Sequence, residues 1–216
     1  MKALLIPVKD PANGKTRLAR RFSAEERRRL AWAMFEDVCR AAEGSREPDL
    51  VVVVTSFEPA AEFALSLGWD VIIERTQVSE SVSVDRASRM LKDHGFGRVM
   101  RLPADVPLVR AEDIDDLMSV DLGAQAALLV PSREGTGTNA IIRSPADLFP
   151  SRFGPGSLAL HKQDARAAGA ECLIRENARI ALDIDEPPDI EAFMKDGRGT
   201  RTFDLLAEMS NLRFEI

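Results

Sequence analysis

Acidic side chains follow two apolar segments of this chain. Leu182 leads directly into Asp183 and Asp185, and Leu102 leads through a short turn-like segment into Asp105. Residues at positions i and i+2 of a strand point to the same face, so Asp183 and Asp185 are predicted to approach one cation together. Adjacent carboxylates repel each other without a cation, and Mg²⁺ commonly uses one or two protein carboxylates with substrate phosphates and water. This spacing favours a divalent-metal site.

Each acid also has a purely structural interpretation. Prolines on both sides of Asp105 suit a turn, and the residue could equally cap a helix. Asp185 or Glu186 could start the next helix, with Pro187 in its first turn. The metal site and the helix start therefore both remain open for this segment.

A basic loop follows the first apolar run, residues 3–8. The loop contains Lys9, Lys15 and Arg17, and its Gly14-Lys15-Thr16 tripeptide invites comparison with a P-loop. That motif needs a glycine five residues before Gly14, where this chain has Lys9, so the P-loop signature fails. The loop is still suited to the phosphates of a nucleotide, because ligands of α/β proteins bind where strands end and helices begin. The alternative is a solvated basic loop.

Two loops of small residues, 135–139 and 153–157, offer backbone N–H groups and hydroxyls. If Ser157 opens the following helix, its hydroxyl and the first free amides would form an anion site. Glycine-rich loops are also common as plain turns. His161 follows Ser157 by four residues and could face this site, but an ordinary histidine on the helix surface is the preferred interpretation.

The elements that must position these residues alternate along the chain. Apolar runs predict strands at residues 2–8, 50–54, 70–73, 98–102, 125–130, 139–143, 171–174 and 179–182. Amphipathic segments predict helices at residues 24–43, 58–67, 83–94 and 111–118, from Ser157, and at 187–195 and 202–209. Ser23 and Glu26 form a capping box for the first helix, in which Trp32 and Phe35 are predicted to be core residues. The order predicts an α/β fold with a mostly parallel sheet and helices on both faces.

The composition is that of a globular protein. The chain has 216 residues, of which 45% are hydrophobic and 30% charged, and we expect residues 1–216 to form a single domain. Cys39 and Cys172 are isolated and are expected to be reduced thiols in a cytoplasmic protein. No apolar run is long enough to span a membrane, and the formal charge of −6 argues against general nucleic-acid binding.

The ordered combination of short motifs resembles the 2-phospholactate or phosphoenolpyruvate guanylyltransferases of coenzyme F-420 biosynthesis. The resemblance runs from about residue 3 to residue 190 and therefore covers most of the chain. The matching pieces are Ile6-Pro7-Val8-Lys9, Lys15-Thr16-Arg17-Leu18, Pro103-Ala104-Asp105-Val106-Pro107, Gly137-Thr138-Asn139, Phe153-Gly154-Pro155-Gly156-Ser157 and Leu182-Asp183-Ile184-Asp185.

The resemblance implies a nucleotide-diphospho-sugar transferase-like, Rossmann-like fold and a Mg²⁺-dependent guanylyltransferase. It would move GMP from GTP onto phosphoenolpyruvate, 2-phospholactate or 3-phosphoglycerate with release of pyrophosphate, and it is expected to be a homodimer. The implied catalytic residues are Lys15, Arg17 and Asp105, the metal ligands Asp105, Asp183 and Asp185, the acceptor-binding residues Thr138, Asn139, Gly154 and Ser157, and the nucleotide-binding residues of the first loop Pro7, Lys9, Lys15 and Arg17.

One segment departs from the family pattern. The family has a Gly-Leu-Asn-like stretch after the third strand, in a region that helps to hold the nucleotide, whereas residues 78–85 here are rich in serine. Ser79, Glu80 and Ser83 are expected to contact base or ribose, since a glutamate can accept the paired N–H donors of guanine. The alternative is a serine-capped helix start.

The expected reaction is in-line attack by a phosphate oxygen of the acceptor on the α-phosphorus of GTP. No general base is needed, because the attacking phosphate is already ionised near neutral pH, and the protein contributes alignment and charge. The alternatives are a nucleotidyltransferase for another acceptor, such as a sugar phosphate or molybdopterin, and a non-catalytic nucleotide-binding protein of the same fold.

Overall fold

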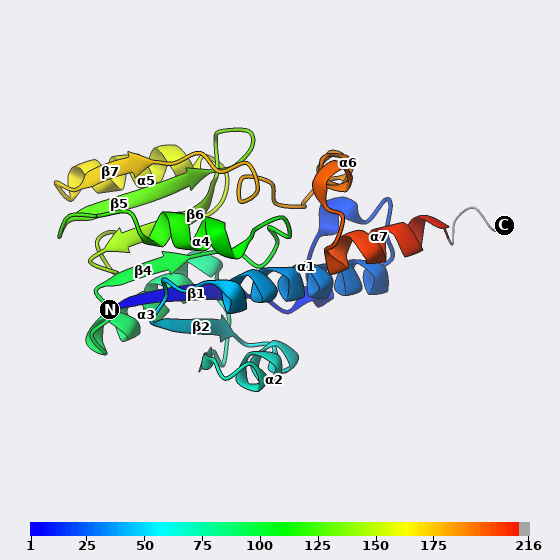
Figure 1. The fold of residues 1–216 in the computed structure, drawn as a ribbon, viewed down its shortest axis with the longest axis horizontal. Coiled ribbons are helices and arrows are strands. Elements are labelled where there is room, and N and C mark those ends of the chain that lie inside the picture. Colours follow the sequence, from blue (N-terminus) through cyan, green and yellow to red (C-terminus); the bar gives the residue numbers. More distant parts are fainter. Residues whose placement is uncertain (212–216) are drawn as a thin grey trace.

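The computed structural model describes residues 1–211, which form a single seven-stranded sheet covered by helices (Figure 1). The strands are β1 (Lys2–Val8), β2 (Leu50–Thr55), β3 (Asp70–Ile73), β4 (Arg98–Arg101), β5 (Ala126–Pro131), β6 (Thr138–Ser144) and β7 (Glu171–Ile174). The helices are α1 (Ala24–Gly44), α2 (Glu58–Ser66), α3 (Glu80–Asp93), α4 (Ala111–Met118), α5 (Ser157–Ala167), α6 (Pro187–Asp196) and α7 (Arg201–Asn211), with the short 3₁₀ helices η1 (Pro11–Asn13) and η2 (Thr16–Leu18).

The sheet has the order β3-β2-β1-β4-β6-β5-β7 and is parallel except for β6, which runs antiparallel to both of its neighbours. This confirms the predicted mostly parallel sheet. The reversed strand has a direct consequence for the site. Because β6 is antiparallel, its first residues lie at the edge where β1 and β4 end, so Thr138 and Asn139 reach the carboxyl edge of the sheet.

Helices cover both faces of the sheet, as the buried clusters show. Leu4 and Ile6 of β1 pack with residues of α1, α2 and α4, whereas Ala3 and Leu5 of the same strand pack with α3 on the opposite face. Both faces of β1 are therefore apolar, which explains its unbroken hydrophobic run. Helix α5 covers the second face over β5 and β6, where Ala165 packs against Ala127 and Leu129.

Helix α1 is longer than the strands and projects past their carboxyl ends (Figure 1). The predicted capping box of Ser23 and Glu26 is present at its start. Leu30 and Met34 on the projecting part pack with α6 and α7, which form a separate buried cluster beyond the sheet. Burial of each such side chain stabilises the fold by about 1.5–3 kcal/mol. The helices that pack together beyond the carboxyl edge are therefore distant from one another in the sequence.

Two predicted elements differ from the structure. Residues 179–182 do not form a strand: a turn spans residues 178–180, because the Asn177 side chain accepts hydrogen bonds from the backbone N–H groups of Arg179 and Ile180. The helix expected at 83–94 begins at Glu80, with the Ser79 hydroxyl accepting a hydrogen bond from the N–H of Val82. The serine-capped helix start is therefore what the structure contains.

Both cysteines are free, as expected. Of the helices within residues 1–211, none has the length and apolar character needed to cross a bilayer.

A buried carboxylate joins α7 to α1. Asp37 is 4% exposed and accepts hydrogen bonds from the N–H groups of Arg201 and Thr202 at 2.8 and 2.9 Å and from the Thr202 hydroxyl at 2.7 Å. The Asp37→Ala variant would leave these donors unpaired, so we expect it to lower the free energy of unfolding by about 1–3 kcal/mol. Thermal unfolding measures the effect, with the exposed Asp121→Ala as the control. Equal stability of the two variants would contradict this role of Asp37.

Candidate active site

Two cavities meet at the carboxyl edge of the sheet. The first, of about 420 Å³, borders the end of β1 and the loop after it, and the second, of about 640 Å³, borders the loops before β6 and α5. They share a wall made by Glu80, Arg101, Pro103, Asp105 and Asp185. This arrangement allows two ligands to reach the same charged groups from opposite sides.

Three carboxylates converge at this wall: Asp105 and Asp185 belong to it, and Asp183 lines the second cavity beside them. Oxygens of Asp105, Asp183 and Asp185 all lie within 4.8 Å of one another. The backbone N–H of Ile184 donates to the carbonyl of Asp105 at 3.2 Å, which ties the two acidic segments together. The predicted grouping of the three acids is therefore present, although a turn followed by an extended segment, and not a strand, carries Asp183 and Asp185.

Asn139 holds the second acidic segment in place. Its amide nitrogen donates to the carbonyls of Ile180 and Ala181 and, at 3.0 Å, to a carboxylate oxygen of Asp183. The side chain is almost fully buried. Asn139 lines the second cavity, but these bonds make it a residue that positions the acids.

Lys15 lies between two of the acids. Its ammonium donates to Asp105 at 2.6 Å and to Asp185 at 2.7 Å, and its side chain is only 10% exposed. Its backbone has a φ of 51°, in the left-handed region that a lysine rarely adopts. A strained backbone that persists around a buried ion-pair cluster is typical of a functional site.

Charge in the wall is unevenly balanced. Burial acts to lower the pKa of Lys15, but Asp105 and Asp185 raise it above its ordinary value. Burial acts to raise the pKa of Asp105, but Lys15 and Arg101 hold it below its ordinary value. Within residues 1–211 no salt bridge joins Asp183 to a cation, and burial together with its neighbours Asp105 and Asp185 raises its pKa to about 6.

The acidic cluster fits a hard divalent cation. It presents carboxylate oxygens close together, which is the donor chemistry that Mg²⁺ takes in sites completed by substrate phosphates. Three carboxylates converge here and the Lys15 ammonium bonds two of them, so further positive charge at this place is favourable. Lys15 and a cation would compete for Asp105 and Asp185.

The second cavity contains the predicted acceptor residues. Thr138, Asn139, Gly154 and Ser157 all line it. The predicted anion site at the start of α5 is smaller than expected, because the N–H of Ser157 donates to the carbonyl of Gly154 and the N–H of Leu158 to the carbonyl of Thr136. Gly156, and not Ser157, is the capping residue. These first two helical amides are therefore already bonded.

His161 is buried, so its placement on the helix surface was wrong. Its Nε2 accepts a hydrogen bond from the N–H of Arg152 at 2.8 Å, and Nδ1 lies 3.0 Å from the hydroxyl of Thr138. Burial, with the positive charges of Arg143 and Arg101, lowers the pKa of His161 to about 4. The neutral ring therefore carries its proton on Nδ1 and orients Thr138.

The first cavity contains Pro7, Lys9, Lys15 and Glu80 from the predicted nucleotide-binding set. Lys9 lies 3.6 Å from the carboxylate of Glu80.

Other members of that set lie elsewhere. Arg17 borders the second cavity, exposed beside Asp185 and Glu186. Ser79 and Ser83 line neither cavity, and the buried Ser83 hydroxyl donates to Glu74 at 2.6 Å. Among residues 79–83, Glu80 is therefore the one that borders the site.

Sequence reasoning missed Arg101. Its guanidinium lines both cavities, pairs with Glu80, donates to the carbonyl of Asn139 at 2.7 Å and lies 4.1 Å from the centre of the Phe153 ring. The available signal was a cation at the end of an otherwise buried strand. Sequence reasoning also placed Trp32 in the core, whereas the ring is half-buried and lines the first cavity.

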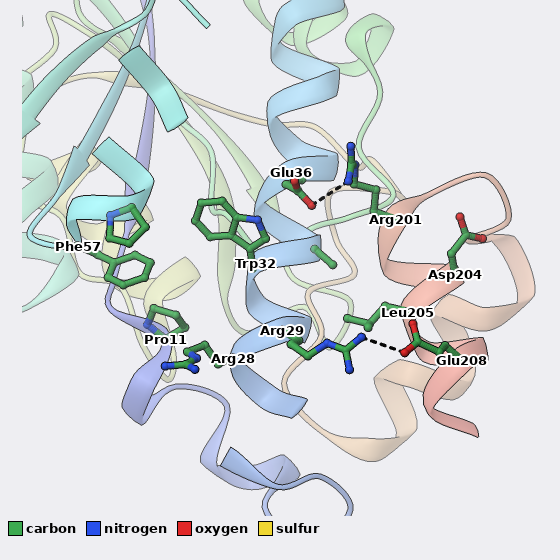
Figure 2. Close-up of a pocket in the computed structure, with 12 residues that line it drawn as sticks. Pro11, Arg28, Arg29, Trp32, Glu36, Phe57, Arg201, Asp204, Leu205 and Glu208 are labelled. Atoms are coloured by element: carbon green, nitrogen blue, oxygen red, sulfur yellow. Dashed lines mark hydrogen bonds and ion pairs between the residues drawn. The ribbon is translucent and has the colours of Figure 1, made fainter. Parts of the chain in front are cut away.

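A separate cavity of about 600 Å³ lies beside the first, between α1 and α7. Figure 2 shows its ion pairs, Arg29 with Glu208 and Arg201 with Glu36, which join the two helices. Trp32 borders both this cavity and the first one. None of the predicted site residues lines it, so it is not part of the candidate active site.

The chain has the fold of nucleotide-diphospho-sugar transferases. A structure described as a putative nucleotide-diphospho-sugar transferase from Desulfovibrio desulfuricans superposes with a TM-score of 0.78 over 98% of this chain and 96% of that one, at 19% identity. The chain itself belongs to the family described as Guanylyl transferase CofC like, which matches residues 1–216.

Two relatives illustrate this membership. The phosphoenolpyruvate guanylyltransferase of Conexibacter woesei is 34% identical over 87% of this chain and 85% of its own length. The 2-phospho-L-lactate guanylyltransferase of Methanothermobacter thermautotrophicus is 30% identical over 98% of this chain and 91% of its own length.

Asp183 should make stability depend on pH. Because its pKa in the folded protein is about 6, above the ordinary value of 3.8, its contribution to stability is full below about pH 4 and is lost as the pH rises through 6. Without divalent cations, Asp183→Asn should raise the melting temperature at pH 8 by about 2–4 °C, the effect of 1 kcal/mol in a chain of this size. The gain should disappear near pH 4.

Thermal unfolding in chelator at pH 4, 6 and 8 checks this expectation, with the exposed Asp121→Asn as control. A gain for Asp183→Asn that is the same at every pH would contradict the charge crowding at this site.

Proposed function

We propose that this protein transfers GMP from GTP to a small phosphorylated acid and releases pyrophosphate, as part of coenzyme F-420 biosynthesis. The acceptor is phosphoenolpyruvate, 2-phospholactate or 3-phosphoglycerate. The observation that carries the proposal is the shared wall: two cavities meet at Asp105 and Asp185, so a nucleotide and an acceptor would reach the same charged groups. Membership of a guanylyl transferase family supports the same reaction.

Asp105, Asp183 and Asp185 would hold Mg²⁺, which supplies positive charge to phosphoryl oxygens when it is bound. Lys15 shares Asp105 and Asp185 with that site, so a triphosphate would offer its ammonium new partners. Arg17 is exposed at the mouth of the second cavity and is free to turn toward phosphate. These cationic groups would therefore stabilise the negative charge that develops on the leaving pyrophosphate.

The nucleotide would occupy the first cavity, with Pro7 and Lys9 along its edge and Glu80 accepting the N–H donors of guanine. The acceptor would occupy the second cavity, against Thr138, Gly154 and Ser157. Asn139 would act indirectly, by holding the acidic segment in place. The whole chain would work as one nucleotidyltransferase domain.

In the reaction, an ionised phosphate oxygen of the acceptor forms a bond to the α-phosphorus of GTP while the bond to pyrophosphate breaks. His161 does not line the second cavity, and both of its ring nitrogens are hydrogen-bonded, so it is not placed to act as a general base there. None is required, because the nucleophile is already ionised. The protein contributes alignment of the two phosphates and stabilisation of charge.

A pyrophosphate-release screen tests the function. Four nucleoside triphosphates are combined with each of the three acids, with a sugar phosphate and with molybdopterin in the presence of Mg²⁺; products are identified by mass, and nucleotide binding is measured in parallel. We expect release with GTP and at least one acid, and a product that carries GMP on the acid's phosphate. Nucleotide binding without release in any combination would favour a non-catalytic protein, and release with only a sugar phosphate or molybdopterin would favour the other acceptors.

The Lys15→Ala variant tests two effects of the ammonium: its competition with Mg²⁺ for the acids and its contribution to turnover. Removing it frees Asp105 and Asp185, so the variant should bind Mg²⁺ more tightly than the wild type in the absence of nucleotide. Turnover should nevertheless fall by about 10²-fold, because a positive charge is lost where negative charge develops. Calorimetric titration with Mg²⁺ and steady-state pyrophosphate release measure the two effects.

The exposed Arg20→Ala, from the same basic stretch, is the control and should change neither value. Weaker Mg²⁺ binding by Lys15→Ala would argue against competition for the acids, and an unchanged rate would remove Lys15 from triphosphate binding.

A further inference from the structure

Arg101 places a positive charge at the end of a buried strand. It is the last residue of β4, a strand that pairs with β1 on one side and β6 on the other. Arg101 is only 6% exposed. A cation taken out of water at such a place requires partners. Glu80, the first residue of α3, provides the carboxylate, the carbonyl of Asn139 accepts a second hydrogen bond, and the Phe153 ring lies beneath the guanidinium.

One donor of this guanidinium is unpaired. Within residues 1–211, Nε of Arg101 is the buried side-chain nitrogen or oxygen that makes no hydrogen bond. Native proteins pair nearly all buried polar atoms, so an exception calls for an explanation. A guanidinium has five N–H donors arranged to bind carboxylates through two parallel bonds. Arg101 therefore retains unused capacity for an anionic oxygen.

Arg101 lies in the lining of the second cavity, so its unpaired donor is suited to the acceptor. Arg17 and Arg133 are the other arginines lining the second cavity, but their side chains are 63% and 42% exposed and lie beside Glu186 and Asp189. Arg101 is the buried one in that lining. Phe153, on which it lies, belongs to the loop that contains Gly154 and leads into Ser157 at the start of α5.

We propose that Arg101 binds the carboxylate of the acceptor and thereby selects phosphorylated acids over phosphorylated alcohols. This inference rests on the proposed function. In the ligand-free protein Glu80 supplies the carboxylate that neutralises Arg101. The carboxylate of the acceptor is chemically equivalent and would take a place beside or instead of Glu80, with Nε as the added donor. A neutral alcohol could not replace that charge, which is the basis of the selection.

The experiment compares matched acceptors. 3-Phosphoglycerate is paired with glycerol 3-phosphate, and 2-phospholactate with ethyl phosphate, so that each pair contrasts a carboxylate with its replacement. For wild type, Arg101→Gln and Arg101→Lys, kcat/KM is measured for both members of a pair, together with KM for GTP. Arg152→Gln, an exposed arginine next to Phe153, is the matched control.

We expect Arg101→Gln to lower kcat/KM for the acids by about 10–100-fold more than kcat/KM for the phosphorylated alcohols, because only the acids lose a charge-assisted contact. Arg101→Lys should recover part of the discrimination, since it keeps the charge without the planar fork. Arg152→Gln should keep the wild-type ratio. Equal losses on acids and alcohols would reduce Arg101 to a structural residue, and a raised KM for GTP alone would assign it to the nucleotide; either result overturns the proposal.

A binding measurement separates this proposal from the reaction itself. In the absence of nucleotide, 3-phosphoglycerate should raise the melting temperature of the wild type more than glycerol 3-phosphate does, and Arg101→Lys should reduce that difference. If the wild type releases no pyrophosphate with any acid but shows this difference, the reaction is wrong and the carboxylate site stands. If it turns over acids while the variants keep the wild-type discrimination, the carboxylate site is wrong and the reaction stands.

Discussion

The crowding of Asp105, Asp183 and Asp185 is the constraint on which the rest of the site depends. Their oxygens approach within 4.8 Å, and like charges this close cannot all stay ionised without cations. Lys15 compensates part of the charge, although it lies 90 and 170 residues from its two partners in the sequence. This crowding, together with burial, raises the pKa of Asp183 and suits the place to a divalent cation. A site with unmet negative charge is prepared to accept both a cation and the phosphates that accompany it.

The fold supplies the restraints that keep this unfavourable arrangement intact. The antiparallel strand β6 brings Asn139 to the carboxyl edge, where its amide holds the segment before Asp183. The carbonyl of Asp105 accepts the N–H of Ile184, so the two acidic segments cannot separate freely. Arg101 is the second cation of the wall, and it lies between the two cavities rather than within one of them. Both proposed substrates would therefore meet the same small set of charges, which is what transfer between them requires.

Local patterns were sufficient for most of the fold. The apolar runs of β1 and β2 reflect burial on both faces of a sheet. In α1 the residues Leu30, Met34, Val38 and Ala42 recur every four positions and are buried on one face of the helix. Both patterns can be recognised in short stretches of sequence. The predicted strand at 179–182 failed because Asn177 bonds two following N–H groups and turns the chain, a competition that hydrophobicity does not register. His161 was misplaced for a related reason: its burial follows from the partners Thr138 and Arg152, which come from other segments.

The sequence by itself determined which groups lie at the carboxyl edge of the sheet. Acids and cations that come soon after apolar runs were expected at this edge, so Lys15, Asp105 and the Asp183–Asp185 pair were found from the chain alone, although the run before Asp183 is not a strand. Only the tertiary structure decided how they are paired: that Lys15 bonds two of the acids, that Ser83 is turned to Glu74, and that Arg101 lies between the cavities. The physical reason is the distance along the sequence over which each interaction acts. Strand and helix preferences act between near neighbours, whereas these ion pairs and hydrogen bonds join segments brought together by burial of the core.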